Sequence, residues 1–461
     1  MNVTIISASK MSTKTQTMPT PLWYLRIIMP LALIVLSLTS SPAFAQQSLE
    51  TFLRHAKEYN FDNREAQTLV KQRMHEATQA WAHLLPSLSI QADYIRNQYL
   101  GAADIPTGEP ATGGILPTRQ VIITPSDQRD VSLSATLPLV NFSTWADIGT
   151  ATANRDAQQA RLAATELDVE KTVAQTYYQF VGAREVARAA RRTLTAAEDN
   201  VRYIDTRAKA GLALDLDSKR ALAEVERDRQ AIEDADYSVT TLRRSLETLT
   251  GIRVEEDSTS IPLEFPKDTL YNDTTLNNWL QSLDTLPSVQ AALYDQHAAN
   301  HTASSSEAAL YPSLSLQFAE TFTNATGFGE SPYYSVKLLA SWKIDFSSSK
   351  SADAQKAAAE ASTVRYERER SAVADALFND WQSVRTQIAK SRAAGSSLIA
   401  SRSALAVARE KYGSGNATFL EVVQAERDAF SAEVTDIQAH EDLASAWAIL
   451  RLSAGQSLVK P

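Results

Sequence analysis

The 461-residue sequence contains no cysteine, so it can form no disulfide and offers no thiol for a lipid anchor. Long apolar runs are also missing, because none approaches the roughly 18 residues that mark a membrane-spanning helix. Positive charge is scarce, since 54 acidic residues outnumber 45 basic ones. That balance disfavours a nucleic-acid partner, which would require a basic surface. If this chain crosses a membrane, it must do so with β-strands.

Proline is absent from two long stretches, 139–261 and 333–460. An uninterrupted helix over 143–209 would be about 100 Å long, at about 1.5 Å per residue. Apolar residues recur at seven-residue intervals, for example at Val225, Ile232, Val239 and Leu246. A seven-residue repeat is typical of coiled-coil packing. The remaining surface is rich in charge and alanine, which favours the wall of a hollow tube over a solid globule.

Catalytic motifs are missing as well. The sequence has no nucleophile elbow, phosphate-binding loop, dinucleotide fingerprint or zinc-protease motif, so an enzyme is the least favoured class. We therefore expect no catalytic residue and no cofactor. His297 and His301 lie four residues apart on an expected helix and could both reach a metal. A zinc site needs at least three protein ligands, and with no third ligand nearby in the sequence we expect no metal site.

The N-terminus has the features of an export signal. A twelve-residue apolar core, 27–38, follows Lys10, Lys14 and Arg26, and Ala43-Phe44-Ala45 provides a cleavage site. This pattern predicts a signal peptide over 1–45. A retained anchor is the alternative, but about 20 residues are needed to span a bilayer. Cleavage removes three basic residues and no acidic ones, so the net charge changes from −9 to −12. An exported chain without cysteine is typical of the bacterial envelope.

The sequence repeats itself internally. Three landmarks recur 204 residues apart: Phe142 and Phe346, Gly211 and Gly415, and Gly251 and Gly455. Upstream, Leu85-Pro86-Ser87-Leu88-Ser89 matches Tyr311-Pro312-Ser313-Leu314-Ser315 at an offset of 226. The difference, 226 − 204 = 22 residues, falls between Pro86 and Phe142. We assign it to the stretch 98–130, which is rich in glycine and proline and is expected to be a long loop.

Alternation of apolar and polar residues predicts four strands, at about 86–98, 130–141, 312–323 and 333–346. Tilted strands of this length can cross an outer membrane. Four strands cannot close a barrel alone, and open edges are not tolerated in lipid, so several chains would have to contribute. A small periplasmic sheet with one buried face is the alternative.

These patterns predict the following domain organisation. The first repeat covers 46–251, with long helices at 143–210 and 215–250. A linker or side domain covers 252–271. The second repeat covers 272–461, with long helices at 347–412 and 418–454. A polar, helical stretch precedes the strands in each repeat, at 48–85 and 275–310.

The turn between the last two helices carries a signature, Tyr412-Gly413-Ser414-Gly415-Asn416-Ala417-Thr418-Phe419-Leu420-Glu421-Val422-Val423-Gln424-Ala425. It resembles the Y-x-x-G-x-x-T-x-x-D-V-L-x-A pattern of the TolC-like outer-membrane efflux proteins, with glutamate for aspartate. The first copy is looser: Gly211, Leu216, Asp217 and Ala221 fit, whereas Ala208 and Leu214 replace the tyrosine and the threonine. Together with the strand entries and the two repeats, the resemblance covers essentially the whole mature chain.

The resemblance implies a mainly α fold with a transmembrane β-barrel portion. Family members are homotrimers with one 12-stranded barrel in the outer membrane and an α-helical tunnel in the periplasm. It implies passive export of substrates from an inner-membrane transporter and a periplasmic adaptor (membrane fusion) protein, through a channel that contacts outer-membrane lipid. The expected location is the cell outer membrane, extending into the periplasm.

Two alternatives remain open at this stage. Drug efflux, metal efflux and type I protein secretion share this architecture, so the cargo is not specified. A different class is a structural periplasmic coiled-coil adaptor or spacer. Such an adaptor normally has one helical hairpin, flanking β-domains and an inner-membrane anchor. This sequence instead predicts two hairpins and four amphipathic strands, which favours the channel.

In the family the tunnel closes at the periplasmic helix turns, where acidic residues gather. The resemblance therefore suggests Asp217, Glu421 and Tyr412 as gate residues, beside the turn glycines Gly211 and Gly415. A purely structural role competes with this function. Thr418 and Glu421 fit a capping box, and acids in a first helical turn interact favourably with the helix dipole. Tyr412 would then pack against a neighbour, and Asp215 would be a helix N-cap.

Overall fold

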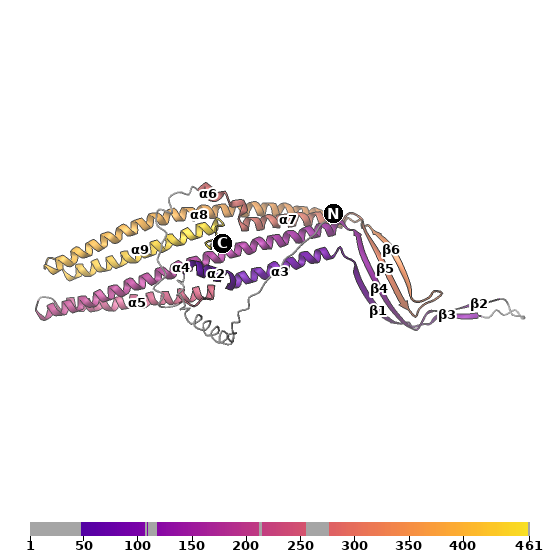
Figure 1. The fold of residues 1–461 in the computed structure, drawn as a ribbon, viewed down its shortest axis with the longest axis horizontal. Helices are drawn as coiled ribbons and strands as arrows, with labels where there is room; N and C mark the ends of the chain where they lie inside the picture. Colours follow the sequence, from indigo (N-terminus) through magenta and orange to yellow (C-terminus); the bar gives the residue numbers. More distant parts are fainter. Residues whose placement is uncertain (1–47, 107, 109–117, 212–213, 255–275, 460–461) are drawn as a thin grey trace, which may run out of the picture. The chain divides into compact units, whose positions relative to one another are not determined.

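The computed structural model describes residues 48–106, 108, 118–211, 214–254 and 276–459. The predicted signal peptide lies outside these residues, and so does 255–271 of the predicted linker. The described part is rich in helix and carries two small sheets (Figure 1). None of its helices combines the length and apolar character needed to cross a membrane.

Four long helices form two antiparallel hairpins. They are α4 (Phe142–Lys209), α5 (Asp215–Thr250), α8 (Phe346–Gly413) and α9 (Phe419–Ser453). α4 and α8 have 68 residues each, and α8 begins and ends 204 residues after α4 (142 + 204 = 346; 209 + 204 = 413). Both start at a side-chain cap: Asn141 accepts from the Thr144 amide, and Asp345 accepts from the Ser348 amide. With no proline inside, nothing in the sequence interrupts either helix.

Shorter helices precede the strands. They are α2 (Leu49–Tyr59), α3 (Phe61–Ala82), α6 (Leu276–Leu280), a 3₁₀ turn (Leu283–Thr285) and α7 (Pro287–Ala308). The helical stretch expected over 48–85 is in fact broken at Asn60, whose ψ of 137° leaves the helical region. The Asn60 side chain accepts from the Asp62 amide and starts α3 afresh. α7 repeats α3 at the 226-residue offset (61 + 226 = 287; 82 + 226 = 308).

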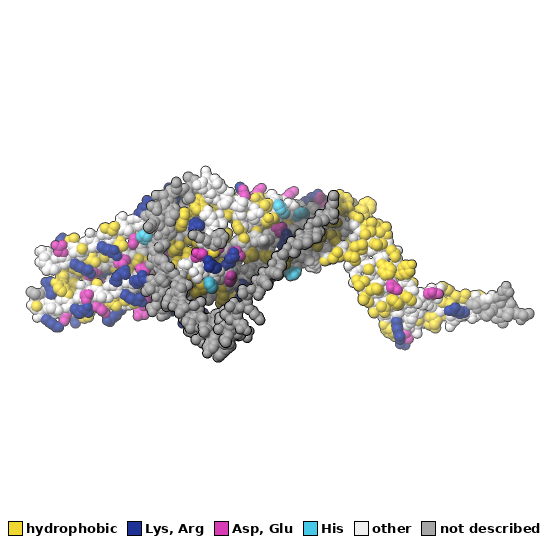
Figure 2. All heavy atoms as spheres, viewed as in Figure 1, with side chains coloured by type: hydrophobic (Ala, Val, Ile, Leu, Met, Phe, Trp, Pro, Cys, Tyr) yellow, Lys and Arg dark blue, Asp and Glu magenta, His cyan; other side chains and the backbone are white. Residues whose placement is uncertain are grey.

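Each hairpin has its own apolar core. In the first, Phe52 and Leu53 of α2 pack with Val173 and Phe180 of α4 and with Leu246 of α5. In the second, residues of α6, α7, α8 and α9 pack together, among them Trp279, Val289, Leu377, Leu443 and Leu450. These side chains lie on the seven-residue stripes or on short helices that cover them. Away from the stripes the long helices stay charged, as coiled-coil surfaces do (Figure 2).

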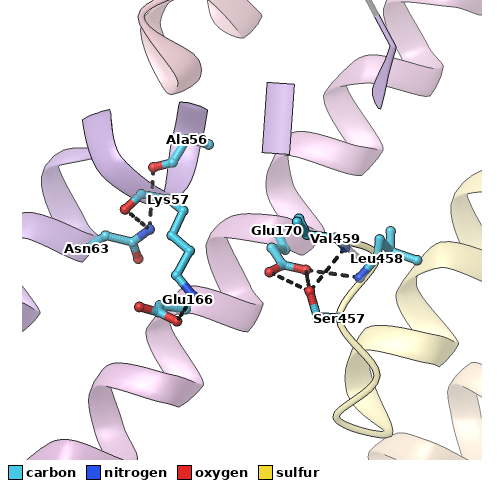
Figure 3. A network of polar contacts seen from close by, with 8 residues as sticks. All are labelled: Ala56, Lys57, Asn63, Glu166, Glu170, Ser457, Leu458 and Val459. Carbon is cyan, nitrogen blue, oxygen red and sulfur yellow. Dashed lines mark hydrogen bonds and ion pairs between the residues drawn. The ribbon is translucent and has the colours of Figure 1, made fainter. Parts of the chain in front are cut away.

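Two residues near the C-terminus, Ser457 and Leu458, bind the middle of α4 (Figure 3). Glu170 is only 7 % exposed, and it accepts the Ser457 hydroxyl at 3.0 Å and the Leu458 amide at 3.3 Å. One turn earlier, Glu166 pairs with Lys57 of α2 at 2.9 Å. This hydrogen-bonded ion pair raises the pKa of the Lys57 ammonium. α4 therefore binds both α2 and the segment 457–459 through adjacent turns.

The main sheet is antiparallel, in the order β1-β4-β5-β6. Its strands are β1 (Ser87–Arg96), β4 (Asp127–Val140), β5 (Ser313–Thr323) and β6 (Tyr333–Ser341). The predicted end of the last strand at 346 is wrong, because the chain leaves the sheet after Ser341. The indole N–H of Trp342 donates to the carbonyl of Leu310 at 2.9 Å, and Asp345 caps α8.

The stretch expected to be one loop, 98–130, contains further strands. β2 (Gly101–Pro106) and β3 (Thr118–Thr124) form a separate two-stranded sheet. β4 also begins within this stretch, at Asp127. The prediction failed because glycine and proline hide the short alternation of residues such as Val121 and Ile123. The backbones of β2 and β3 nevertheless pair, even though β2 contains Gly101 and Pro106.

The register of the main sheet puts apolar side chains on one face. Leu316 of β5 lies opposite Leu338 of β6 and Leu137 of β4, and Ile90 of β1 lies opposite Leu133 of β4. The other face carries serine, threonine, glutamine and lysine, as in the pair Gln317 and Lys337. Leu88, Ile90, Val336 and Leu338 are each at least 60 % exposed, so nothing in the described chain covers the apolar face. Figure 2 shows hydrophobic side chains gathered over this sheet.

Gly182 of α4 faces a carboxylate of α9. A Cβ added there would meet Oε2 of Glu441 and lie 3.0 Å from its Cδ. Gly182→Ala therefore requires the Glu441 carboxylate to move, so we expect its melting temperature to be lower than that of Gly395→Ala, although both substitutions gain up to about 1 kcal/mol from helix propensity. Gly395→Ala in α8 is the matched control, because its nearest contact is an ordinary 3.5 Å. Adding Glu441→Ala to Gly182→Ala should remove the difference, and equal melting temperatures for the two single variants would contradict the assignment.

The same carboxylate makes stability depend on pH. Burial, and to a smaller extent the charge of Asp442, raises the pKa of Glu441 to about 7 from 4.5. The folded state disfavours the ionised form, so stability is lost as pH rises from about 4.5 through about 7. Glu441→Gln should remove this loss, and its unfolding free energy should exceed the parent's by about 1–2 kcal/mol at pH 8. Near pH 4 the two should be alike. Urea unfolding at both pH values tests this, and an equal advantage at pH 4 would refute it.

Candidate functional site

The two helix turns are built on left-handed glycines. Gly211 has a φ of 77° and Gly415 a φ of 79°, a conformation that residues with a Cβ rarely adopt. After α8, the Gly415 amide donates to the carbonyl of Tyr412, and the Asn416 amide donates to that of Lys411. This pair of bonds is a Schellman motif, which closes the C-terminus of a helix. The turn glycines are thus required by the backbone.

Glu421 lies in a complete capping box. Its Oε1 accepts the Thr418 amide at 3.3 Å and the Thr418 hydroxyl at 3.0 Å, while the Thr418 Oγ1 accepts the Glu421 amide at 3.4 Å. The structural role foreseen for this pair is therefore present. Only Oε1 takes part in the box, and the residue stays exposed at the turn. A capping role and a role in the channel are compatible.

Asp217 is placed differently in the first copy. α5 has Leu214 at its N-cap, with no side-chain hydrogen bond, so the expectation that Asp215 is the N-cap is wrong. Asp215 is instead the first helical residue, where its charge meets the positive end of the helix dipole. Asp217 lies two residues further, with its side chain 16 % exposed and 3.8 Å from Arg220. Without a capping box, this helix start is less strongly fixed than that of α9.

Tyr412 joins the ends of the two hairpins. Its ring lies 6.3 Å from that of Tyr203 on α4 and 5.8 Å from that of Phe419 on α9. The guanidinium of Arg207 sits over both tyrosine rings, 5.2 Å from Tyr412 and 5.6 Å from Tyr203, and donates to the Tyr203 hydroxyl at 2.9 Å. Beneath them, Ile204, Ala221, Phe419 and Val423 form a small buried core. We call the set Tyr203, Arg207, Tyr412 and Phe419 the turn joint.

The structure brings Tyr412 close enough to Asp217 for the carboxylate to affect the pKa of the phenol. Burial raises the pKa of Tyr412, Arg207 opposes the rise, and the negative charge of Asp217 adds to it. Glu421 is engaged with Thr418 instead. Sequence reasoning missed Tyr203 and Arg207, although their i,i+4 spacing just before Gly211 is a signal for a helix-end pair.

The two histidines considered as metal ligands do not gain a third. Within the described ranges, no group of three or more histidine, aspartate or glutamate side chains is arranged to hold a metal. His301 lies against the backbone of Gly149 on α4, close enough that a Cβ there would clash with the ring. His297 contacts the ring of Tyr294. His301 thus packs between α7 and α4, whereas the contact of His297 lies within α7 itself.

The sequence profile of the family described as outer membrane efflux protein matches residues 52–252 and 280–456. The fold is similar to that of the outer-membrane channel OprN, with a TM-score of 0.72 and 19 % identity over 89 % of this chain and 90 % of that one. It is similar to CusC (TM-score 0.72, 18 % identity, 90 % and 93 % coverage). It is also similar to the Neisseria gonorrhoeae MtrE outer-membrane channel in its open state, with a TM-score of 0.70 and 20 % identity over 89 % of this chain and 89 % of that one. No curated protein sequence matches the chain.

Proposed function

Because this chain belongs to the outer membrane efflux protein family, we propose that it is an outer-membrane channel through which substrates pass out of the cell. The four-stranded sheet carries the proposal. Within the described residues β1 and β6 each pair on one side only, so the sheet has two open edges. Its apolar face is exposed as well. Open edges and a bare apolar face are tolerated only if other copies complete the sheet and lipid covers the face.

The strand directions allow such closure. Neighbouring strands in the order β1-β4-β5-β6 are antiparallel, so β6 of one copy can pair antiparallel with β1 of the next. A ring of identical chains then forms an all-antiparallel barrel with four strands from each chain. Three copies, the number that the TolC-like resemblance implies, give 3 × 4 = 12 strands. The apolar face contacts outer-membrane lipid, and the face with Lys337 and Gln317 lines the lumen.

The long helices form a periplasmic tunnel in this arrangement. α4 follows β4 after one residue and α8 follows β6 after four residues, so each hairpin continues from the sheet. A helix of 68 residues is about 100 Å long at about 1.5 Å per residue. The tunnel is passive, because transport energy comes from an inner-membrane transporter and a periplasmic adaptor delivers the cargo. The cargo can be a drug, a metal ion or a protein.

The helix turns are the gate of this tunnel. Asp217 and Glu421 put two carboxylates of each chain at the turns, so three chains would put six around one opening. Tyr412 supports this role because the turn joint fastens the second hairpin to the first. Opening would require the joint to loosen, while the capping box keeps Glu421 and its helix intact.

Extraction from membranes tests the channel against a coiled-coil spacer of the periplasm. The full chain, expressed with its signal peptide, should stay in the outer-membrane fraction after washes with high salt and alkaline carbonate. A spacer that only touches the membrane surface would be released by the same washes. Recovery in the soluble fraction would refute the channel.

A further inference from the structure

The helices next to the main sheet follow the order of its strands. α3 leads into β1, α4 leaves β4, α7 leads into β5 and α8 leaves β6. Accordingly, α3 packs on α4, α4 on α7, and α7 on α8 (Figure 1). If β6 of one copy pairs with β1 of the next, as in the proposed function, α8 comes to lie beside α3 of that next copy. The internal repeat specifies which faces of the two helices then meet.

The contact between α4 and α7 is the counterpart of this contact within one chain. α8 repeats α4 after 204 residues, and α3 precedes its repeat α7 by 226 residues. Thr150 and Thr302 share a hydrogen bond of 3.3 Å, and the Ser305 hydroxyl donates to Asp147 at 2.5 Å. The residue numbers of both pairs add up to 452, so these antiparallel helices keep one register. The two offsets convert this register to 452 + 204 − 226 = 430 for α8 against α3 of the next copy.

α7 meets α4 with a face that α3 also possesses but leaves exposed. On α7 every residue of this face is buried or half-buried: Ser288, Ala291, Asp295, Ala298, Thr302 and Ser305. The 226-residue offset assigns the equivalent face of α3, which consists of Asp62, Glu65, Leu69, Gln72, Glu76 and Gln79. All of these except Glu76 are exposed, so no described part of the chain covers this face of α3.

α8 has an exposed face at the matching positions. All of its residues are exposed: Ser351, Ala354, Ala358, Ala361, Arg365 and Arg368. Most of the α4 residues that they repeat are buried or half-buried, and Ala157, the counterpart of Ala361, is completely buried. The three alanines of α8 allow a neighbouring helix to approach closely. A second copy of this chain supplies that helix, because α3 is the counterpart of α7.

Charge complementarity supports the same register independently. Glu65 lies opposite Arg365 (65 + 365 = 430), and Asp62 lies opposite Arg368 (62 + 368 = 430). Within the described ranges, none of these four side chains takes part in a hydrogen bond or an ion pair. The register was obtained from Thr150 and its neighbours, without reference to these charges. Two acids of one helix thus match two unpaired arginines of the other.

The contact within the chain contains an ion pair of the same kind. Arg161 of α4, which Arg365 repeats, forms an ion pair with Asp295 of α7. α3 has Leu69 in place of this aspartate, so the exact partner is lost. Glu65 lies one turn away on the same face and restores an acid for the arginine.

We propose, on the basis of the oligomer in the proposed function, that α8 of each copy packs against α3 of the next copy. Arg365 binds Glu65 and Arg368 binds Asp62 across this interface. Arg365 is 19 residues from the start of α8 (365 − 346 = 19), which is about 28 Å along the helix. The ion pairs therefore join neighbouring chains well away from the sheet.

Disulfide cross-linking tests the register, because the chain has no cysteine of its own. The variant combines Gln72→Cys with Ala358→Cys, two facing positions (72 + 358 = 430). After oxidation of outer membranes with copper–phenanthroline, it should give covalent oligomers on non-reducing gels, since a disulfide forms when the Cα atoms are within about 7 Å. Met74→Cys with Ala358→Cys is the matched control. Met74 lies about 200° around α3 from Gln72, so this variant should stay monomeric on the same gels.

Charge reversal tests the ion pairs. Arg365→Glu combined with Arg368→Glu should lower the yield of heat-resistant oligomer at least about tenfold, because like charges then face each other between chains. Adding Asp62→Arg and Glu65→Arg to the same chain should restore the yield. Normal yield from the first variant, or no recovery in the second, would overturn the ion pairs.

The parent protein separates this contact from the proposed channel. If heat-resistant oligomer is present in the parent's membranes but Gln72→Cys with Ala358→Cys gives no cross-link, the helical contact is wrong and the channel stands. If the parent forms no oligomer in the outer membrane, both are wrong.

Discussion

Leu338→Arg is expected to abolish assembly of the channel in the outer membrane. Leu338 is 65 % exposed and lies opposite Leu316 in the middle of the apolar face. An arginine facing the centre of the bilayer costs about 2–4 kcal/mol in transmembrane barrels. Each chain of an assembly pays this cost, so the effect multiplies with the number of copies. The measurement is the yield of heat-resistant oligomer in isolated outer membranes.

The neighbouring position provides the matched control. Leu339 lies opposite Ser315 on the polar face, so Leu339→Arg places the same cation toward the lumen and should assemble normally. Lys337→Ser, which removes a charge from the polar face, should also be tolerated. Normal oligomer yield from Leu338→Arg would show that the apolar face does not meet lipid. Failure of Leu339→Arg alone would mean that the two faces are assigned the wrong way round.

In the sheet, the alternation of apolar and polar residues predicts the faces of the strands but not their ends. The period of two is a property of the strand itself, so the sequence alone indicates which residues share a face, for example Leu338 and Ala340. It does not say where a strand stops. Trp342 and Ile344 continue the alternation, yet the indole bond to Leu310 and the Asp345 cap take them out of β6. Both interactions involve residues outside the strand, which the alternation pattern does not describe.

In the helices, too, local patterns were predictable from the sequence and single contacts were not. A lack of proline and a seven-residue apolar stripe depend on local sequence, so the helix-rich architecture could be predicted. The break at Asn60 depends on one backbone angle and one side-chain hydrogen bond, which a periodic pattern does not contain. The hairpin β2–β3 was missed because pairing across the loop, rather than composition, creates it.

The candidate site likewise combines features that the local sequence encodes with contacts between distant segments. The capping box of Glu421 and the turn glycines are encoded within a few residues, and the sequence suggested both. The turn joint needs α4 beside α8, an arrangement that sequence spacing does not give. Contacts between distant segments can be assigned only once the helices have been placed.

Neutralising the carboxylates at the helix turns should abolish block of the channel by multivalent cations. If three chains meet there, Asp217 and Glu421 contribute 3 × 2 = 6 negative charges around a narrow opening. Such a ring attracts divalent and trivalent cations strongly, so cations added on the periplasmic side should block the current of the parent. The variant combines Asp217→Asn with Glu421→Gln, and the measurement is single-channel current in a planar bilayer. We expect the blocking concentration to rise by at least about 100-fold, equivalent to about 2.7 kcal/mol.

The choice of substitutions separates gating from capping. Glutamine can replace glutamate at the third position of a capping box, so Glu421→Gln keeps the bond to the Thr418 amide. Asp205→Asn is the matched control. Asp205 is an acid of α4 near the turn at Gly211, and it pairs with Lys209 on the helix surface. This control should be blocked like the parent. If the double variant is blocked at the parent's concentration, Asp217 and Glu421 act only at the helix starts. The constriction must then be formed by other residues of the turns.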